Sequence, residues 1–280
     1  MTGTGTQART FAVRSDDGHH FDLLHVAPQQ PPIAQLLWLP ALGVQARHYL
    51  PLAHALASHG CAVSLHEWRG HGSSSLRASR DHNWGFAQLL HNDLAASIAC
   101  LQAAGIGVDT LGGHSLGGQL SCCLAPSLPN LKRLWLVASG SPYWRSFPSP
   151  RRWSLPAAYT ALPAIAALNG HLPGRQLGFG GREARGLIAD WARVGRCGRY
   201  RSPTGVEQQM TQLQLSCTSI TLADDWLAPA SSLDALLKKL PASKQQRITL
   251  DATALGVRAD HFAWMRQPSA VAAALLRIFP

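Results

Sequence analysis

Short apolar segments alternate with helical patterns along most of the chain, and this alternation limits its fold more than any other feature. The segments typical of strands are 10–14, 21–26, 35–39, 61–65, 108–112, 132–138, 218–222 and 247–251. Helical spacing of apolar residues occupies 47–59, 84–104, 115–125, 230–240 and 268–277. Strands joined through helices pair in parallel, because each helix carries the chain back to the starting edge of the sheet. We therefore predict an α/β fold with a mostly parallel sheet covered by helices.

The alternation stops between residues 142 and 205, so this segment is predicted to be an insertion in the α/β core. It contains ten arginines, no lysine and two acidic residues, and so carries +8 of the chain's net charge of +10. The basic charge is therefore concentrated in one segment. No helix-turn-helix, zinc-finger or RNA-recognition pattern accompanies it, and we do not expect a nucleic-acid partner.

The six cysteines argue against a metal site and against a disulfide framework. They are scattered, without a C-x-x-C pair or a paired Cys/His motif that would complete a zinc site. We expect reduced thiols in a cytoplasmic protein that needs neither a metal nor an organic cofactor. The first residues lack a basic stretch followed by an apolar one, so no secretory signal is expected. No apolar run approaches the ~20 residues of a membrane span.

A G-x-S-x-G motif, Gly113-His114-Ser115-Leu116-Gly117, joins a predicted strand to a predicted helix. A serine in such a sharp turn presents its hydroxyl at the start of the helix, and the flanking glycines remove steric clashes. The backbone N–H of Leu116 then points toward a developing oxyanion, aided by the helix dipole. The motif predicts Ser115 as a nucleophile. A glycine-rich turn that only packs tightly is the structural alternative.

A serine nucleophile requires a base, and the base requires an orienting acid, in the chain order Ser, Asp or Glu, His. Beyond the strand predicted at 218–222, His261 is the one remaining histidine. Asp224 and Asp225 follow the end of that strand directly. Asp225 is the preferred acid, and Asp224 is left for a loop cap or a backbone hydrogen bond.

With these motifs the chain resembles the α/β-hydrolase superfamily over nearly its full length. The resemblance rests on the serine motif, the Arg69-Gly70-His71-Gly72-Ser73 loop, 225–229 and Asp260-His261-Phe262. The chain is most similar to a group of predicted bacterial α/β-hydrolases with Pro-Ala-Leu-Gly after the third strand and Gly-Phe-Gly-Gly-Arg-Glu-Ala-Arg in the insertion. The resemblance implies an α/β-hydrolase core of 1–141 and 206–280 with an eight-stranded sheet. It also implies that residues 142–205 form a helical cap or lid.

The resemblance also implies the roles of the site residues: Ser115 attacks, His261 acts as base and then acid, and Asp225 orients the histidine. A second oxyanion donor is implied in the loop after the third strand, where many members have His-Gly and this chain has Pro40-Ala41-Leu42-Gly43. Aligning Pro40 with that histidine makes the Leu42 N–H the expected donor, and Ala41 and Gly43 remain alternatives.

Two further features are predicted to be structural. The Arg69–Ser73 loop is expected to brace the site more than to act in catalysis. Cys122 and Cys123, which follow Ser115 in the predicted helix, are expected to be packing thiols.

Three functions follow from these residues. The first is hydrolysis of a carboxylic ester or thioester through an acyl-enzyme. The second keeps the triad but transfers the acyl group to another acceptor or cleaves a C–C bond. The third is a non-catalytic protein that binds acidic lipid or nucleic acid through the basic insertion. Aromatic residues among the insertion's arginines favour a small-molecule acyl substrate that could carry an anionic group gripped by arginine. The oligomeric state is left open.

Overall fold

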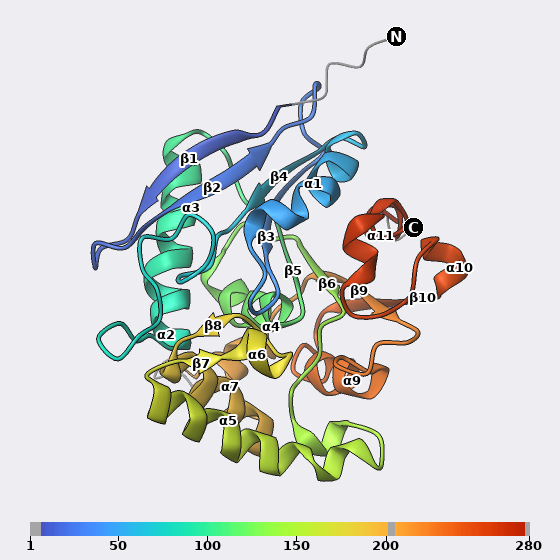
Figure 1. Ribbon diagram of the computed structural model, residues 1–280. Coiled ribbons are helices and arrows are strands. Elements are labelled where there is room, and N and C mark those ends of the chain that lie inside the picture. Colours follow the sequence, from blue (N-terminus) through green and yellow to red (C-terminus); the bar gives the residue numbers. More distant parts are fainter. Residues whose placement is uncertain (1–6, 201–204, 278–280) are drawn as a thin grey trace.

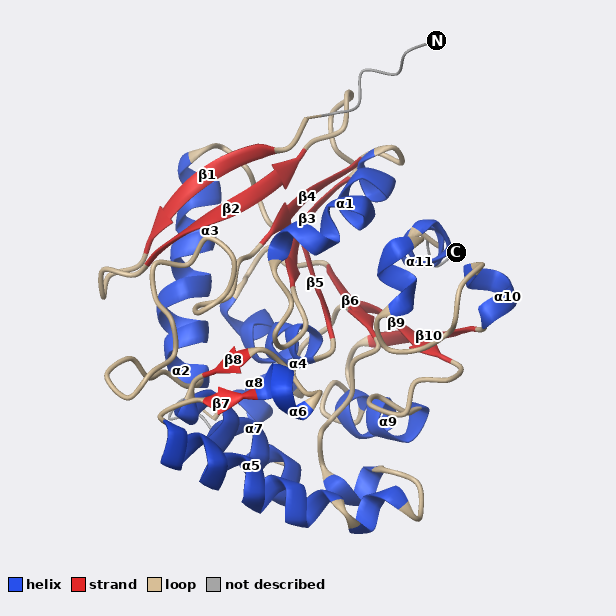
Figure 2. Ribbon diagram, in the orientation of Figure 1, coloured by secondary structure: helices blue, strands red, loops and turns tan. Residues whose placement is uncertain are grey.

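The structure is a computed structural model that describes residues 7–200 and 205–277. Its centre is an eight-stranded sheet in the order β1-β2-β4-β3-β5-β6-β9-β10, drawn in Figure 2. β1 and β2 form an antiparallel edge that continues antiparallel onto β4, whereas the other neighbours pair in parallel. The strands are Arg9–Arg14, His20–Val26, Ala34–Leu39, Cys61–Leu65, Thr110–His114, Arg133–Val137, Ser216–Leu222 and Lys244–Leu250 for β1 to β6, β9 and β10. The predicted mostly parallel α/β sheet is confirmed.

Helices cover both faces of this sheet and divide the core into two apolar clusters. One face packs against α1 (Leu50–Ala57), α10 (Ala252–Leu255) and α11 (Ser269–Leu275). The other packs against α3 (Leu94–Ala103), α4 (Leu116–Leu124) and α9 (Ala230–Leu237). Figure 1 shows this arrangement, with the sheet between the two helical layers. Because helices cover both faces, the residues of the central strands β4, β5 and β6 are almost all buried.

Two elements differ from the sequence-based expectation. The predicted helix over 84–104 is interrupted: α2 (Phe86–Gln88) is followed by a π-helical turn, η2 (Leu89–Asp93), before α3. The turn ends at Asp93, whose buried carboxylate binds distant polar residues. The strand predicted at 108–112 lies at 110–114 instead. Asp109 precedes it and bonds both neighbouring strands, because its carboxylate accepts from the Gln35 N–H (3.0 Å) and its carbonyl from the Lys132 N–H (2.8 Å).

The segment between β6 and β9 forms a separate group of elements. Its helices and strands are η4 (Trp144–Ser146), η5 (Arg151–Trp153), α5 (Leu155–Asn169), β7 (Leu172–Pro173), α6 (Gly174–Leu177), β8 (Arg182–Glu183) and α7 (Arg185–Cys197). β7 and β8 pair with each other and not with the main sheet. In Figure 1, α5, α7 and this small sheet lie together beyond the ends of β3 and β5. α8 (Val206–Met210) follows and contacts α4.

Some residues used in the sequence analysis lie outside the described residues. They are the first six residues, in which no secretory signal was found, and Arg201, one of the ten arginines of the insertion. Within 7–200 and 205–277, no helix combines the length and the apolar character that crossing a membrane requires.

Candidate active site

The turn between β5 and α4 presents Ser115 in an unusual backbone conformation. Ser115 has φ 55° and ψ −118°, in the region that residues with a side chain rarely adopt. Its N–H donates to the Val137 carbonyl (3.1 Å), which ties the turn to β6. A Cβ at Gly113 would lie 2.4 Å from the backbone of Gly117. Only glycine at that position lets the helix start so close to the strand, which is the steric condition that the motif predicted.

Two further predicted residues meet beside this turn. Asp225 follows β9, His261 follows β10, and the Asp225 Oδ2 to His261 Nδ1 distance is 2.7 Å. The other carboxylate oxygen of Asp225 accepts from the N–H groups of Leu227 (2.9 Å) and Ala228 (3.1 Å). Both side chains are buried. The carboxylate is therefore held by three donors in an orientation that leaves Nε2 as the free side of the His261 ring.

The neighbouring aspartate has a different environment. Asp224 is exposed, and its backbone N–H donates to the Ala259 carbonyl (3.0 Å). Of the two candidates that the sequence offered, Asp225 is therefore the one that the fold pairs with His261.

Ser115 and His261 line the same narrow cavity of about 90 Å³. Both expected oxyanion residues, Leu42 and Leu116, line it as well. The remaining wall is mainly apolar and comes from both parts of the chain: Ala41, Gln119, Gly140, Pro142, Phe147, Gly178, Phe179, Gly180, Trp191, Leu227, Ala228 and Phe262. An uncharged, largely apolar group fits such a wall.

Hydrogen bonds reduce the alternatives for the second oxyanion donor. The Ala41 N–H donates to the Tyr49 hydroxyl (2.9 Å), so this amide is already engaged. Gly43 has φ 78°, and a Cβ there would lie 2.4 Å from the backbone nitrogen of Gly181. Gly43 thus packs directly against the insertion. Of the three candidates, Leu42 is the one that neither bonds to Tyr49 through its amide, as Ala41 does, nor packs against Gly181, as Gly43 does.

A polar connection that the sequence did not reveal lies behind the nucleophile turn. Tyr49 Oη lies 2.8 Å from Nδ1 of His114, and the His114 ring lies 4.7 Å from the ring of His261. Burial, reinforced by the nearby His261, holds the pKa of His114 well below 6.5, so the ring is neutral. A histidine at a buried strand end requires a polar partner, which was the available signal. The partner itself comes from 65 residues earlier in the chain.

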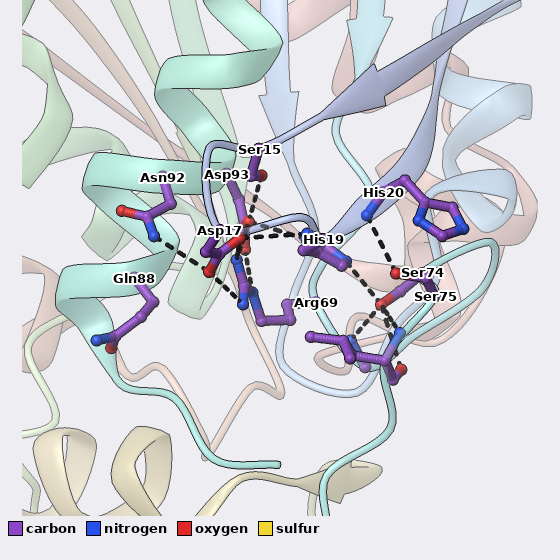
Figure 3. Close-up of polar contacts among 12 residues, drawn as sticks. Ser15, Asp17, His19, His20, Arg69, Ser74, Ser75, Gln88, Asn92 and Asp93 are labelled. Carbon is purple, nitrogen blue, oxygen red and sulfur yellow. Dashed lines mark hydrogen bonds and ion pairs between the residues drawn. The ribbon is translucent and has the colours of Figure 1, made fainter.

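The Arg69–Ser73 loop is anchored by a buried polar cluster, drawn in Figure 3. Arg69 binds both carboxylate oxygens of Asp93 (2.9 and 2.6 Å), and His19 bridges Asp93 (2.9 Å) and Ser74 (2.8 Å). Burial would raise the pKa of Asp93, but the hydrogen bonds and charge of Arg69, with His19, hold it well below its usual value. These contacts hold the loop in place, and its bracing role toward the site stays a prediction.

A second buried pair joins this loop to the insertion. His71 Nε2 lies 3.2 Å from Glu183 Oε2, and Glu183 Oε1 accepts from the Gly181 N–H (2.6 Å). Burial lowers the pKa of His71, but the Glu183 carboxylate, together with Glu67, raises it by more than burial lowers it. The pKa of His71 is therefore above its usual value. In the sequence, Glu183 is visible only as one of the two acidic residues of the insertion. The pair holds Gly181 against Gly43, next to the expected oxyanion donor.

None of the nine described arginines of the insertion lines the cavity. Four bond backbone or an acid: Arg182 binds the Ala78 carbonyl, Arg185 that of Arg80, Arg196 that of Tyr159, and Arg193 pairs with Asp190. Three others lie over tryptophan rings: Arg145 on Trp144, Arg151 on Trp226 and Arg152 on Trp153. The arginine grip on an anionic substrate group therefore has no counterpart at the described cavity.

The cysteines near Ser115 have the character of packing residues. Cys122 and Cys123 are buried, and burial raises the pKa of the Cys123 thiol to about 12. Such a thiol stays protonated and unreactive. Among the residues that the structure describes, no group of three or more His, Cys, Asp and Glu side chains is arranged to hold a metal ion.

Comparisons with known proteins agree with this architecture. The family model described as "Serine aminopeptidase, S33" matches residues 30–178. Among curated proteins, none matches the chain significantly.

Solved structures resemble the chain over nearly its full length. A hydrolase from Pseudomonas aeruginosa PA01 has a TM-score of 0.66 at 17% identity, covering 99% of this chain and 98% of its own. The esterase domain of a Rhodothermus marinus protein has 0.64 at 17%, covering 96% and 95%. A thioesterase domain from the curacin biosynthetic pathway has 0.60 at 16%, covering 96% and 99%. At these identities the likeness establishes the α/β-hydrolase fold.

Proposed function

The chain belongs to the serine aminopeptidase S33 family and is an α/β-hydrolase-fold hydrolase, and from this premise we propose that it cleaves a carboxylic ester or thioester. The observation that carries the proposal is the Asp225–His261 pair (2.7 Å), whose histidine lines one cavity with the strained Ser115. A nucleophile, a base and an orienting acid, from the connections after three strands, are the groups that acyl transfer requires.

The proposed reaction begins with attack by Ser115 Oγ on the substrate carbonyl. His261 takes the hydroxyl proton at Nε2 and returns it to the departing alcohol or thiol, which leaves an acyl-serine. Asp225 keeps Nδ1 protonated and stabilises the imidazolium. Water, deprotonated by His261, then attacks the acyl-serine, the serine takes back its proton, and a carboxylic acid is released.

The negative oxygen formed in both steps is assigned to the backbone N–H groups of Leu116 and Leu42. Leu116 is the first residue of α4, where the helix dipole favours negative charge. The engagement of Ala41 with Tyr49 supports Leu42 as the second donor.

We assign residues 142–205 to a cap on a core of 1–141 and 206–280. Phe147, Phe179 and Trp191 of this segment line the cavity, which supports the assignment. The group with the Pro-Ala-Leu-Gly loop remains the proposed position of the chain within its superfamily.

A cytoplasmic location is part of the proposal. All six cysteines are free, as expected of a protein kept in a reducing compartment.

Covalent labelling tests the function directly. A fluorophosphonate probe should label the wild-type protein, and labelling should disappear in Ser115→Ala. A panel of neutral esters and thioesters of increasing acyl length should be hydrolysed by the wild type only. Product formed solely when an alcohol, amine or thiol acceptor is added would identify an acyltransferase. Folded protein that is neither labelled nor active would contradict the proposal.

A further inference from the structure

One polar side chain of the cavity has no part in the proposed chemistry. Gln119 lies one helical turn after Ser115 on α4, and its N–H donates to the Ser115 carbonyl (3.2 Å). Gln119 is only 5% exposed and lines the cavity together with Ser115. A buried amide in an apolar wall requires hydrogen-bond partners, since an unpaired one is costly.

Tyr200 determines the orientation of this amide. The Tyr200 hydroxyl donates to Gln119 Oε1 (3.0 Å). Tyr200 is itself buried, its N–H donates to Glu207 (2.7 Å), and Lys239 lies over its ring. With the carbonyl oxygen engaged, the Gln119 NH2 group remains, and it can only donate. The hydrogen bonds recorded for the described residues include no acceptor for it.

The position of His261 separates the two sides of a bound ester. The leaving group must lie against His261, which protonates it, and therefore near Phe262, whose ring centroid is 4.7 Å from that of His261. The acyl group is then left with the wall formed by α4 and the insertion, where Gln119, Phe179 and Trp191 lie. The Phe179 and Trp191 rings are 4.9 Å apart and form an apolar surface. On the acyl side, the NH2 of Gln119 is thus a hydrogen-bond donor set beside an aromatic wall.

We propose that Gln119 is a specificity-determining residue that donates its amide NH2 to an oxygen on the acyl group, so that the preferred substrates are oxo- or hydroxyacyl esters or thioesters. The inference rests on the proposed hydrolase function and narrows its substrate class. An unsubstituted acyl chain still fits the apolar wall but leaves the NH2 unpaired. A site with a buried donor discriminates against such a substrate. When the substrate binds, the NH2 group loses its hydrogen bond to water and gains no acceptor in exchange.

The test compares two esters of the same alcohol, butanoate and 3-oxobutanoate, in wild type and Gln119→Leu. The readout is the ratio of kcat/KM for the oxo ester to that for the plain ester. The intrinsic reactivity of the oxo ester cancels when the ratios of the two proteins are compared. Gln119→Leu should lower the ratio about tenfold, mainly through the oxo substrate. Gln119→Glu, which keeps the acceptor for Tyr200 but presents a carboxylate, should lower it at least as far.

Two control variants separate recognition from folding. Tyr200→Phe removes the hydroxyl that orients the amide and should lower the ratio by a smaller factor. Gln102→Leu makes the same replacement on the exposed side of α3 and should leave the ratio unchanged. Equal loss on both esters in Gln119→Leu would show that Gln119 only supports the fold, and an unchanged ratio would also overturn the inference. Failure of the hydrolase function is recognised separately, since plain butanoate would then not be cleaved in a Ser115-dependent way.

Discussion

The α/β core and the inserted segment differ in charge and in what they contribute to the candidate site, and the more highly charged region is not the one that holds the proposed catalytic groups. The core is close to neutral, yet it carries Ser115, Asp225 and His261, in the connections that follow β5, β9 and β10. The insertion carries +8, yet what it adds to the cavity is apolar: Phe147, Phe179 and Trp191. Seven of its nine described arginines bind carbonyls, an acid or tryptophan rings instead. The distribution of charge along the sequence therefore does not indicate where the proposed catalytic residues lie.

The two regions are joined by buried polar contacts next to the site. Glu183 of the insertion binds His71 of the core, and Tyr200 binds Gln119 on α4. Each contact joins residues far apart in the sequence, so the cavity depends on both regions docking correctly. Substitutions can therefore separate what the core does from what the insertion does.

The largest effect is expected at the core's reacting groups. Ser115→Ala and His261→Ala should each lower kcat by several powers of ten, roughly 10⁴ to 10⁶, because the nucleophile and its base act as a unit. Steady-state ester hydrolysis measures this loss, with far-ultraviolet circular dichroism as the check on folding. In the insertion, Trp153→Ala removes an exposed ring and should change kcat less than about twofold. Near-normal turnover by Ser115→Ala would remove the serine from the mechanism.

A smaller but still large effect should distinguish the adjacent aspartates. Asp225→Asn leaves His261 without its anionic partner and should lower kcat by about 10² to 10⁴. Asp224→Asn changes an exposed side chain and is its matched control, with an expected change of less than about twofold. The kcat values of the two variants, measured in parallel, decide the assignment. The reverse order would make Asp224 the acid.

The docking of the insertion should depend on the His71–Glu183 pair. Glu183→Gln removes the carboxylate that stabilises protonated His71 and should lower the free energy of unfolding by about 2 to 3 kcal/mol near pH 6. Because the folded-state pKa of His71 is raised, the charged pair is fully present below pH 6.5. Its contribution should decline as the pH rises through the raised value.

Urea unfolding of wild type and Glu183→Gln at pH 6 and pH 9 measures this difference. The gap between the two proteins should be larger at pH 6. Glu67 and Arg77 also influence His71, so both stay unchanged in the comparison. A gap that is constant or grows with pH would show that His71 is not protonated in the folded protein.

The smallest effect is expected from the arginines that lie over tryptophans. Replacing Arg145, Arg151 and Arg152 together by glutamine should alter the kcat/KM ratio for esters with and without a terminal carboxylate by less than about twofold. None of the three lines the cavity. A selective loss of activity on the anionic ester would restore the arginine grip that the composition suggested.

Much of the fold followed from local patterns. Strand and helix periodicity predicted the sheet, because each depends on residues two to four apart. The turn at Ser115 was predictable for the same reason, since Gly113 and Gly117 satisfy a steric condition within one motif. His261 and the adjacent candidates Asp224 and Asp225 followed from chain order, because parallel strands end at one edge of the sheet and bring successive loops together. The contact of Asp225 with His261 is what separates it from Asp224.

The sequence by itself therefore determined the sheet, the serine turn and the candidate triad of this protein. Only the tertiary structure decided which residues support them. The Arg69–Asp93 bond at the end of the π turn, the Tyr49–His114 contact and the His71–Glu183 pair each join segments whose spacing in the chain carries no periodic signal. Periodicity records which side of an element a residue occupies, but the partner on that side is chosen by long-range packing. For the same reason the sequence showed the positive charge of the insertion, but it did not show that none of the insertion's described arginines lines the cavity.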